Sequence, residues 1–203
     1  MRLVLATALA FAAAPLLAQM PTTPPGAHDA SRVVAGTYEV DTGHTQVLFT
    51  VNHLGFTEYT GQFTQPTGSL TLDPANAAND KVEVSFPIDQ VSTTVAALNT
   101  HLKSPDFFDA AKYPTGKFVS TRVTVTGETA TIEGNLTLKD VTKPIVLNAR
   151  FVGAGNAPMG AKKPYVGFAA TTTINRSDFH LGFGVPMVSD KVDLTINAGF
   201  AQK

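Results

Sequence analysis

Seven polar side chains could bind a charged group or move a proton: Asp41, His44, His53, His101, Arg176, Asp178 and His180. His44 and His53 are nine residues apart, so a single strand through both would place them on opposite faces. The chain has no cysteine and no HxH, HxxxH or HExxH pattern. The histidines therefore lack the spacing of a zinc site, and we expect no metal.

Acid–base catalysis is a further chemistry that these residues could support. Asp41 and His44 are close enough in sequence to share a hydrogen bond, and His44 or His53 could move a proton. However, no GxSxG elbow or comparable nucleophile setting is present, and no Gly-rich phosphate loop follows a strand. We expect a protein that is not an enzyme and has no cofactor; a lipid-modifying enzyme is the weaker alternative.

The elements that must position these residues are strands. Val82, Val84, Phe86 and Ile88 alternate with polar neighbours, which puts one face of a strand on an apolar interior. The 15 basic and 16 acidic residues nearly cancel, which argues against a nucleic-acid partner. So many strands with so little helix predict an all-β sandwich or barrel. The expected strands are 37–40, 45–53, 67–73, 80–88, 116–125, 129–139, 143–153, 164–175 and 191–200.

Two segments interrupt this pattern. Residues 92–103 begin with capping residues and place Val95, Leu98 and Leu102 at helical spacing, so a short helix is expected there. Such a helix could close one end of a barrel or simply pack on the sheet. The segment 175–191 is long for a hairpin and too apolar for a solvated loop, so we expect it to fold over an opening.

The N-terminal residues divide into two further segments. Residues 1–18 combine Arg2 with an apolar stretch too short for a membrane span, which predicts a signal peptide and a periplasmic location. Residues 19–35 are rich in Pro and Thr and are expected to form a flexible tether. Residues 36–203 are expected to form a single barrel domain.

The alternation alone does not decide whether the barrel is filled or hollow, because the inward side chains could fill a small barrel or line a cavity. The stretch from Tyr38 to Phe49 resembles the Y-x-x-D-x-x-H-S/T-x-V-x-F opening of the YceI-like family. The segments HLKSPDFFDAAKYPTGKFVST (101–121), GNLTLKDVTKPIVL (134–147) and NRSDF (175–179) resemble its later blocks in the same order. One departure is His180, where the family often has glycine.

This resemblance implies an antiparallel lipocalin-like barrel of about eight strands, with one short helix and a long loop closing an end. It implies a periplasmic carrier that holds a long-chain isoprenoid, a quinone or a similar amphiphilic lipid in an apolar cavity. Transient membrane contact and a homodimer are compatible with it. The alternative is a barrel without ligand that serves as a protein-interaction or stress-response domain.

The residues expected to bind the ligand are of two kinds. Those expected along the lipid chain or closing over it are Phe49, Val51, His53, Phe86, Leu98, Leu102, Phe107, Phe108, Leu136, Phe168, Arg176 and Phe179. The candidates for contact with a polar head group are His44, His53, Arg176 and Asp178. Arg176 has a second interpretation, in which it holds its own loop in place through Asp178.

Overall fold

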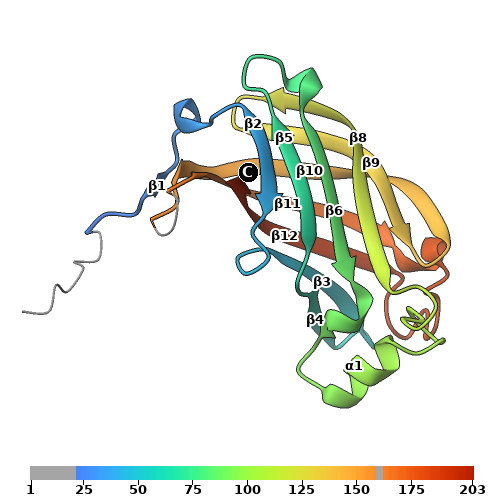
Figure 1. Ribbon diagram of the computed structural model, residues 1–203. Coiled ribbons are helices and arrows are strands. Elements are labelled where there is room, and N and C mark those ends of the chain that lie inside the picture. Colours follow the sequence, from blue (N-terminus) through green and yellow to red (C-terminus); the bar gives the residue numbers. More distant parts are fainter. Residues whose placement is uncertain (1–21, 159–161) are drawn as a thin grey trace, which may run out of the picture.

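A computed structural model describes residues 22–158 and 162–203, which form one antiparallel sheet (Figure 1). Its strands are β1 (Gly26–Ala27), β2 (Gly36–Val40), β3 (Gln46–His53), β4 (Thr57–Phe63), β5 (Thr67–Leu72), β6 (Lys81–Pro87), β7 (Val91–Ser92), β8 (Thr115–Thr126), β9 (Thr129–Leu138), β10 (Val141–Asn156), β11 (Pro164–Asn175) and β12 (Lys191–Gln202). The helices are α1 (Ala96–Leu102) and the short 3-10 turns η1 (Ala30–Arg32), η2 (Ala77–Asn79), η3 (Ile88–Gln90) and η4 (Arg176–Phe179).

The sheet closes on itself as a barrel. Strand β11 pairs with both β10 and β12, and β12 pairs with β2, which completes the ring β2–β5–β6–β8–β9–β10–β11–β12. Strand β12 also pairs through its earlier half with β3, which pairs in turn with β4. The expected all-β antiparallel barrel of about eight strands is therefore confirmed.

Strand β4 is the main element that the sequence pattern did not predict. Its inward residues are Tyr59, Gly61 and Phe63, so a glycine interrupts the apolar alternation. The glycine is required by its neighbour across the ladder, because a Cβ at Gly61 would lie 2.3 Å from the Phe49 ring. The apolar alternation of β4 is therefore interrupted because of Phe49, a residue of the neighbouring strand β3.

The helix α1 is shorter than expected and begins at Ala96 rather than Ser92. Ser92 belongs to β7, and the backbone N–H of Thr93 donates to Asn99 Oδ1 at 2.7 Å, which ties the approach segment to the helix. None of the helices in the described ranges is long and apolar enough to cross a membrane.

The segment expected to be a flexible tether, 19–35, is only partly within the described residues. From residue 22 onward it is docked on the barrel rather than free: β1 pairs with β10, and η1 follows it. His28 bonds to the Glu128 carboxylate at 2.8 Å and to the Val152 carbonyl at 3.2 Å. This corrects the expectation for 22–35; the predicted signal peptide, 1–18, lies outside the described residues.

Candidate ligand-binding cavity

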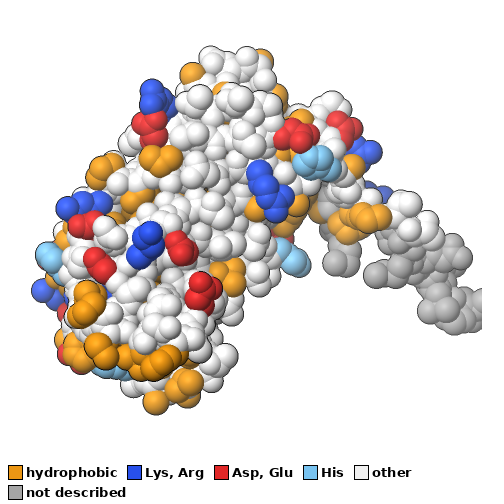
Figure 2. Space-filling model, turned by 180° about the vertical axis from the view of Figure 1, so that it is seen from behind, with side chains coloured by type: hydrophobic (Ala, Val, Ile, Leu, Met, Phe, Trp, Pro, Cys, Tyr) orange, Lys and Arg blue, Asp and Glu red, His pale blue; other side chains and the backbone are white. Residues whose placement is uncertain are grey.

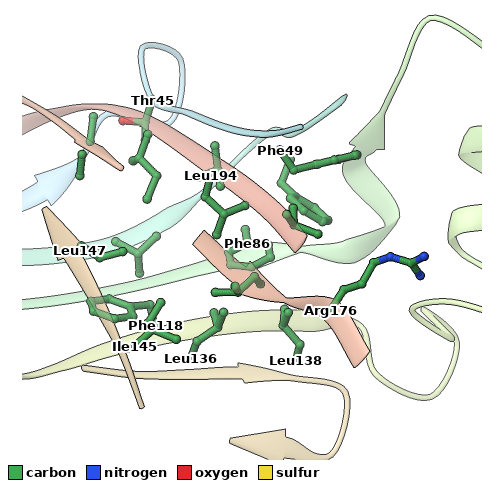
Figure 3. Close-up of a pocket in the computed structure, with 18 of the residues that line it drawn as sticks. Thr45, Phe49, Phe86, Phe118, Leu136, Leu138, Ile145, Leu147, Arg176 and Leu194 are labelled. Atoms are coloured by element: carbon green, nitrogen blue, oxygen red, sulfur yellow. The ribbon is translucent and has the colours of Figure 1, made fainter. Parts of the chain in front are cut away.

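An apolar cavity of about 650 Å³ lies inside the barrel (Figure 3). Its wall is made by inward side chains of β3, β4, β5, β6 and β8 to β12, which is the face that the period-two alternation selects. Several of these side chains, such as Ile132, Ile145 and Ile196, are only partly buried although they point inward. Their remaining exposed surface faces the cavity, so the barrel is hollow rather than filled.

Phenylalanine rings occupy the space over glycines on neighbouring strands. Phe49 lies opposite Gly61, and Phe86 lies opposite Gly116. A Cβ built on Gly116 would come within 2.4 Å of the Phe86 ring. Because a side chain at either glycine would push the facing ring aside, these glycines help to set the width of the cavity.

The end of the barrel near α1 is closed by aromatic and aliphatic side chains from outside the sheet. Leu98 and Leu102 reach the cavity from α1, Phe107 and Phe108 from the segment after it, and Phe183 from the loop between η4 and β12. The Phe108 ring packs edge-on against Phe63 with 5.4 Å between centroids. The helix and this loop together therefore cover one end of the barrel.

The few polar side chains on the cavity wall are concentrated at its two ends. His53, Tyr59 and His101 lie near α1, where His101 Nε2 bonds to the Asp106 carboxylate at 2.9 Å. Asp80 and Lys81 lie at the opposite end, where β6 begins, and burial raises the pKa of the Asp80 carboxyl. A molecule with a long apolar body and a polar end would match this distribution.

Arg176 is 6% exposed and holds the loop before β12 in place. Its guanidinium donates to the carbonyl oxygens of Ser189 at 2.8 Å, Phe183 at 2.8 Å and Val188 at 2.9 Å, and also to that of Leu181. Burial lowers the pKa of Arg176, and the charge of Asp190 opposes this shift. Figure 3 shows the guanidinium pointing away from the apolar side chains of the cavity.

Arg176 lines the cavity, but its donors are committed to backbone carbonyls. The structure thus gives it the loop-holding position and not that of a head-group ligand. Asp178, the expected partner of Arg176 in the loop, is exposed. The acid that bonds to this loop is Asp190 instead, and its carboxylate accepts from the Ser177 backbone N–H at 2.8 Å.

Most residues predicted to contact the lipid chain do line the cavity, but three predicted residues do not. Asp178 is exposed on η4, and Phe179, the last residue of η4, is 1% exposed and packs in the apolar core. His44 is 79% exposed outside the barrel. Contact with a ligand stays a prediction for those on the wall: Phe49, Val51, His53, Phe86, Leu98, Leu102, Phe107, Phe108, Leu136 and Phe168.

His44 has a structural partner instead. Its Nδ1 bonds to Asp41 Oδ2 at 2.8 Å, and the Tyr165 hydroxyl donates to the same oxygen at 3.0 Å. Burial alone would raise the pKa of Asp41, but the hydrogen bonds from His44 and Tyr165 outweigh it and lower that pKa. The hydrogen bonds among Asp41, His44 and Tyr165 join the β2–β3 junction to the start of β11. No cluster of three or more metal-binding side chains occurs anywhere in the described part of the chain.

At the end of the cavity near α1, the sequence pattern missed the polar wall residues Tyr59 and His101 for different reasons. Tyr59 lies on β4, which was not predicted, and its hydroxyl bonds to Thr94 Oγ1 at 3.1 Å. The sequence identifies His101 as a polar candidate but does not place it at the cavity. Its helical spacing from Leu98 was the available indication, because residues three apart share a helix face.

Residues 38–200 match the family model of the YceI-like domain. The chain belongs to the YceI-like family. Protein YceI of Escherichia coli is 39% identical over 177 residues, which cover 86% of this chain and 92% of that protein. The match thus includes nearly the whole of this relative.

Solved structures of YceI-like proteins share the fold. The YceI protein of Campylobacter jejuni is 30% identical and superposes with a TM-score of 0.67 over 75% of this chain and 90% of that one. A polyisoprenoid-binding domain from Saccharophagus degradans superposes with a TM-score of 0.62 over 82% of this chain and 98% of that one. At 15% identity the second comparison supports the architecture alone.

Proposed function

We propose that this protein binds a long-chain isoprenoid, or a similar amphiphilic lipid such as a quinone, and carries it through the periplasm. The observation that carries the proposal is the apolar cavity of about 650 Å³, which has polar groups only at its ends. The Saccharophagus degradans domain, which shares this architecture, is named as a polyisoprenoid-binding domain, and the ligand class is proposed here by analogy with it. The predicted signal peptide supports the location.

The size of the cavity indicates how much of a lipid it can hold. If a methylene group occupies about as much space as a water molecule, roughly 30 Å³, the cavity accepts about twenty carbons. Removing these from water at about 0.8 kcal/mol each contributes on the order of 16 kcal/mol. Ordering a flexible tail offsets much of this gain. Binding should therefore tolerate several chain types, with the head group adding modest discrimination.

The head group would lie at the end of the cavity near α1. His53, Tyr59 and His101 are the polar wall residues there besides Arg176, and His53 and the Tyr59 hydroxyl can donate a hydrogen bond to a carbonyl or a phosphate. Of the head-group candidates expected from the sequence, only His53 keeps this role. The tail would extend past Phe86 and Leu136 toward the beginning of β6.

The first test identifies the cargo directly. The protein is purified from its full-length gene without detergent, weighed by native mass spectrometry and extracted with organic solvent. An added mass that extracts as a prenyl lipid or quinone is the expected result. A clean mass that stays unchanged after incubation with such lipids would refute the carrier and favour a barrel that binds a protein partner.

A pair of matched substitutions tests whether the cavity holds the cargo. Val51→Trp places an indole in the cavity, whereas Val146→Trp places it on the outer face of β10, where Val146 is 44% exposed. Val51→Trp should remove most of the extractable lipid, and Val146→Trp should leave it unchanged. If Val51→Trp melts like the parent and still yields the same amount of lipid, the cavity assignment is wrong.

A further inference from the structure

Exposed apolar side chains are concentrated at the end of the barrel that carries α1. Ten large hydrophobic residues of the described chain are exposed, and six of them lie at this end. Figure 2 shows hydrophobic side chains gathered over the lower end of the molecule, the end where Figure 1 places α1. We call these six residues the apolar rim: Leu54, Phe56, Val95, Phe183, Val185 and Met187.

The two main segments of the apolar rim are held together by backbone contacts. The Leu54 N–H donates to the Met187 carbonyl at 2.8 Å, and an isolated bridge pairs His53 with Val188. Phe183 is fixed on its other side, because its ring packs edge-on against His101 and Phe107 with centroid separations of 5.3 Å. The rim is therefore a connected surface rather than scattered side chains.

The segments that form the apolar rim contain no formal charge. Residues 53–57, 92–100 and 181–189 include no Asp, Glu, Lys or Arg, whereas the flanking positions Glu58, Asp190 and Lys191 are charged. Phe56 is 85% exposed and Met187 is 62% exposed, and neither lines the cavity. Uncharged loops that present isolated large apolar side chains are suited to insertion into a fluid apolar layer.

The apolar rim is continuous with the cavity. Val95 is 48% exposed and Phe183 is 51% exposed, yet both also line the cavity. Gly184 and Val188 of the same loop line it as well. An apolar chain leaving the cavity between these residues would pass along apolar side chains of the rim, whose own segments carry no charged residue.

We propose that the apolar rim docks on the surface of a lipid bilayer, with Phe56 and Met187 inserted between the lipids. This inference rests on the proposed function, because a lipid carrier must exchange its cargo with a membrane. The continuity of rim and cavity favours a bilayer over a second copy of the chain, which would cover the exit. Because the rim is uncharged, docking should depend little on anionic lipid or on salt.

Vesicle flotation tests the docking. The protein, purified from its full-length gene, is mixed with phosphatidylcholine vesicles that contain no prenyl lipid. It is compared with Phe56→Ser/Met187→Ser. The matched control is Val146→Ser/Val152→Ser, whose two valines are 44% and 46% exposed outside the rim and do not line the cavity. Because moving one large apolar side chain out of water changes partition by about tenfold, the rim variant should bind vesicles at least tenfold more weakly. The control should bind like the parent.

The other outcomes separate docking from lipid carriage. A rim variant that floats as well as the parent overturns the docking, as does binding that requires phosphatidylglycerol and disappears in salt. The rim would instead be an interface with a second copy of the chain if the parent sediments as a dimer and does not bind vesicles, while the rim variant sediments as a monomer. Native mass spectrometry of the same samples reports the cargo independently. A protein that docks but carries no lipid would refute the carrier function alone.

Discussion

Replacing Arg176 by methionine should destabilise the barrel by about 3 kcal/mol. Methionine keeps the unbranched apolar stem of arginine but removes the guanidinium, which donates to four carbonyl oxygens of the loop before β12. A hydrogen bond is worth about 1 kcal/mol net, so the four together give about 4 kcal/mol. The Phe183 residue is exposed, so water can rehydrate its carbonyl and reduce the loss.

Urea unfolding followed by circular dichroism measures this effect, since the chain has no tryptophan to report it by fluorescence. For a domain of this size, about 3 kcal/mol corresponds to a fall in Tm of roughly 6 to 12 °C. Arg122→Met is the matched control, because Arg122 is 67% exposed and pairs with Glu133 on the surface. It should cost less than about 1 kcal/mol.

A third variant separates the loss of the charge from the loss of the hydrogen bonds. Arg176→Lys retains the charge but offers a single nitrogen, which cannot reach all four carbonyls, so its loss of stability should lie between those of Arg122→Met and Arg176→Met. If Arg176→Met unfolds at the same urea concentration as Arg122→Met, the contacts of the guanidinium with the carbonyl oxygens do not stabilise the loop.

Two further predictions concern other parts of the barrel. Gly116→Ala should destabilise the protein by about 2 kcal/mol, because the added methyl group overlaps the Phe86 ring. Urea unfolding should show a smaller loss of stability when the same substitution is made in a Phe86→Leu variant. Equal losses in both backgrounds would contradict the explanation. The pKa of His28 is raised by its bonds to the Val152 carbonyl and then to Glu128. The contribution of His28 to the docking of β1 should therefore be complete below its ordinary pKa of 6.5 and be lost as the pH rises through the raised value. Hydrogen exchange of the β1 amides, corrected for intrinsic rates, should become faster over this pH range in the parent but not in His28→Ala.

The alternation of apolar residues was sufficient to predict most of the barrel. The long strands β8 to β12 follow it closely because one face of each packs on the apolar interior. It failed at β4, where Gly61 replaces an apolar residue to accept the Phe49 ring. That requirement is a contact between two strands, so no local pattern in either strand contains it.

The candidate site was predictable along the cavity wall but not at its polar ends. Period two places Phe49 and Val51 on the same face, and the sequence therefore grouped them correctly. It offered a bond between Asp41 and His44, and a loop-holding role for Arg176, but it could not choose between these positions and contact with a head group. Asp41 holds His44 outside the barrel, and backbone carbonyls hold the Arg176 guanidinium. The identity of a polar residue shows what it could bind, but it does not show whether its side chain points into the cavity or away from it.

The pairing of β12 has a consequence for how the protein folds. One strand of twelve residues joins β11 to β2 through Phe200 and to β3 through Leu194, so both open edges of the sheet are closed by the same element. Strand β2 pairs with β5 on one side, but its other edge stays unpaired until residues 200–202 have been synthesised. Closure thus requires contacts across about 160 positions of the chain, which makes folding slow relative to that of locally connected proteins. A nascent chain released before β12 would expose unpaired strand edges and the apolar interior, so chaperone binding during synthesis is expected to protect these regions.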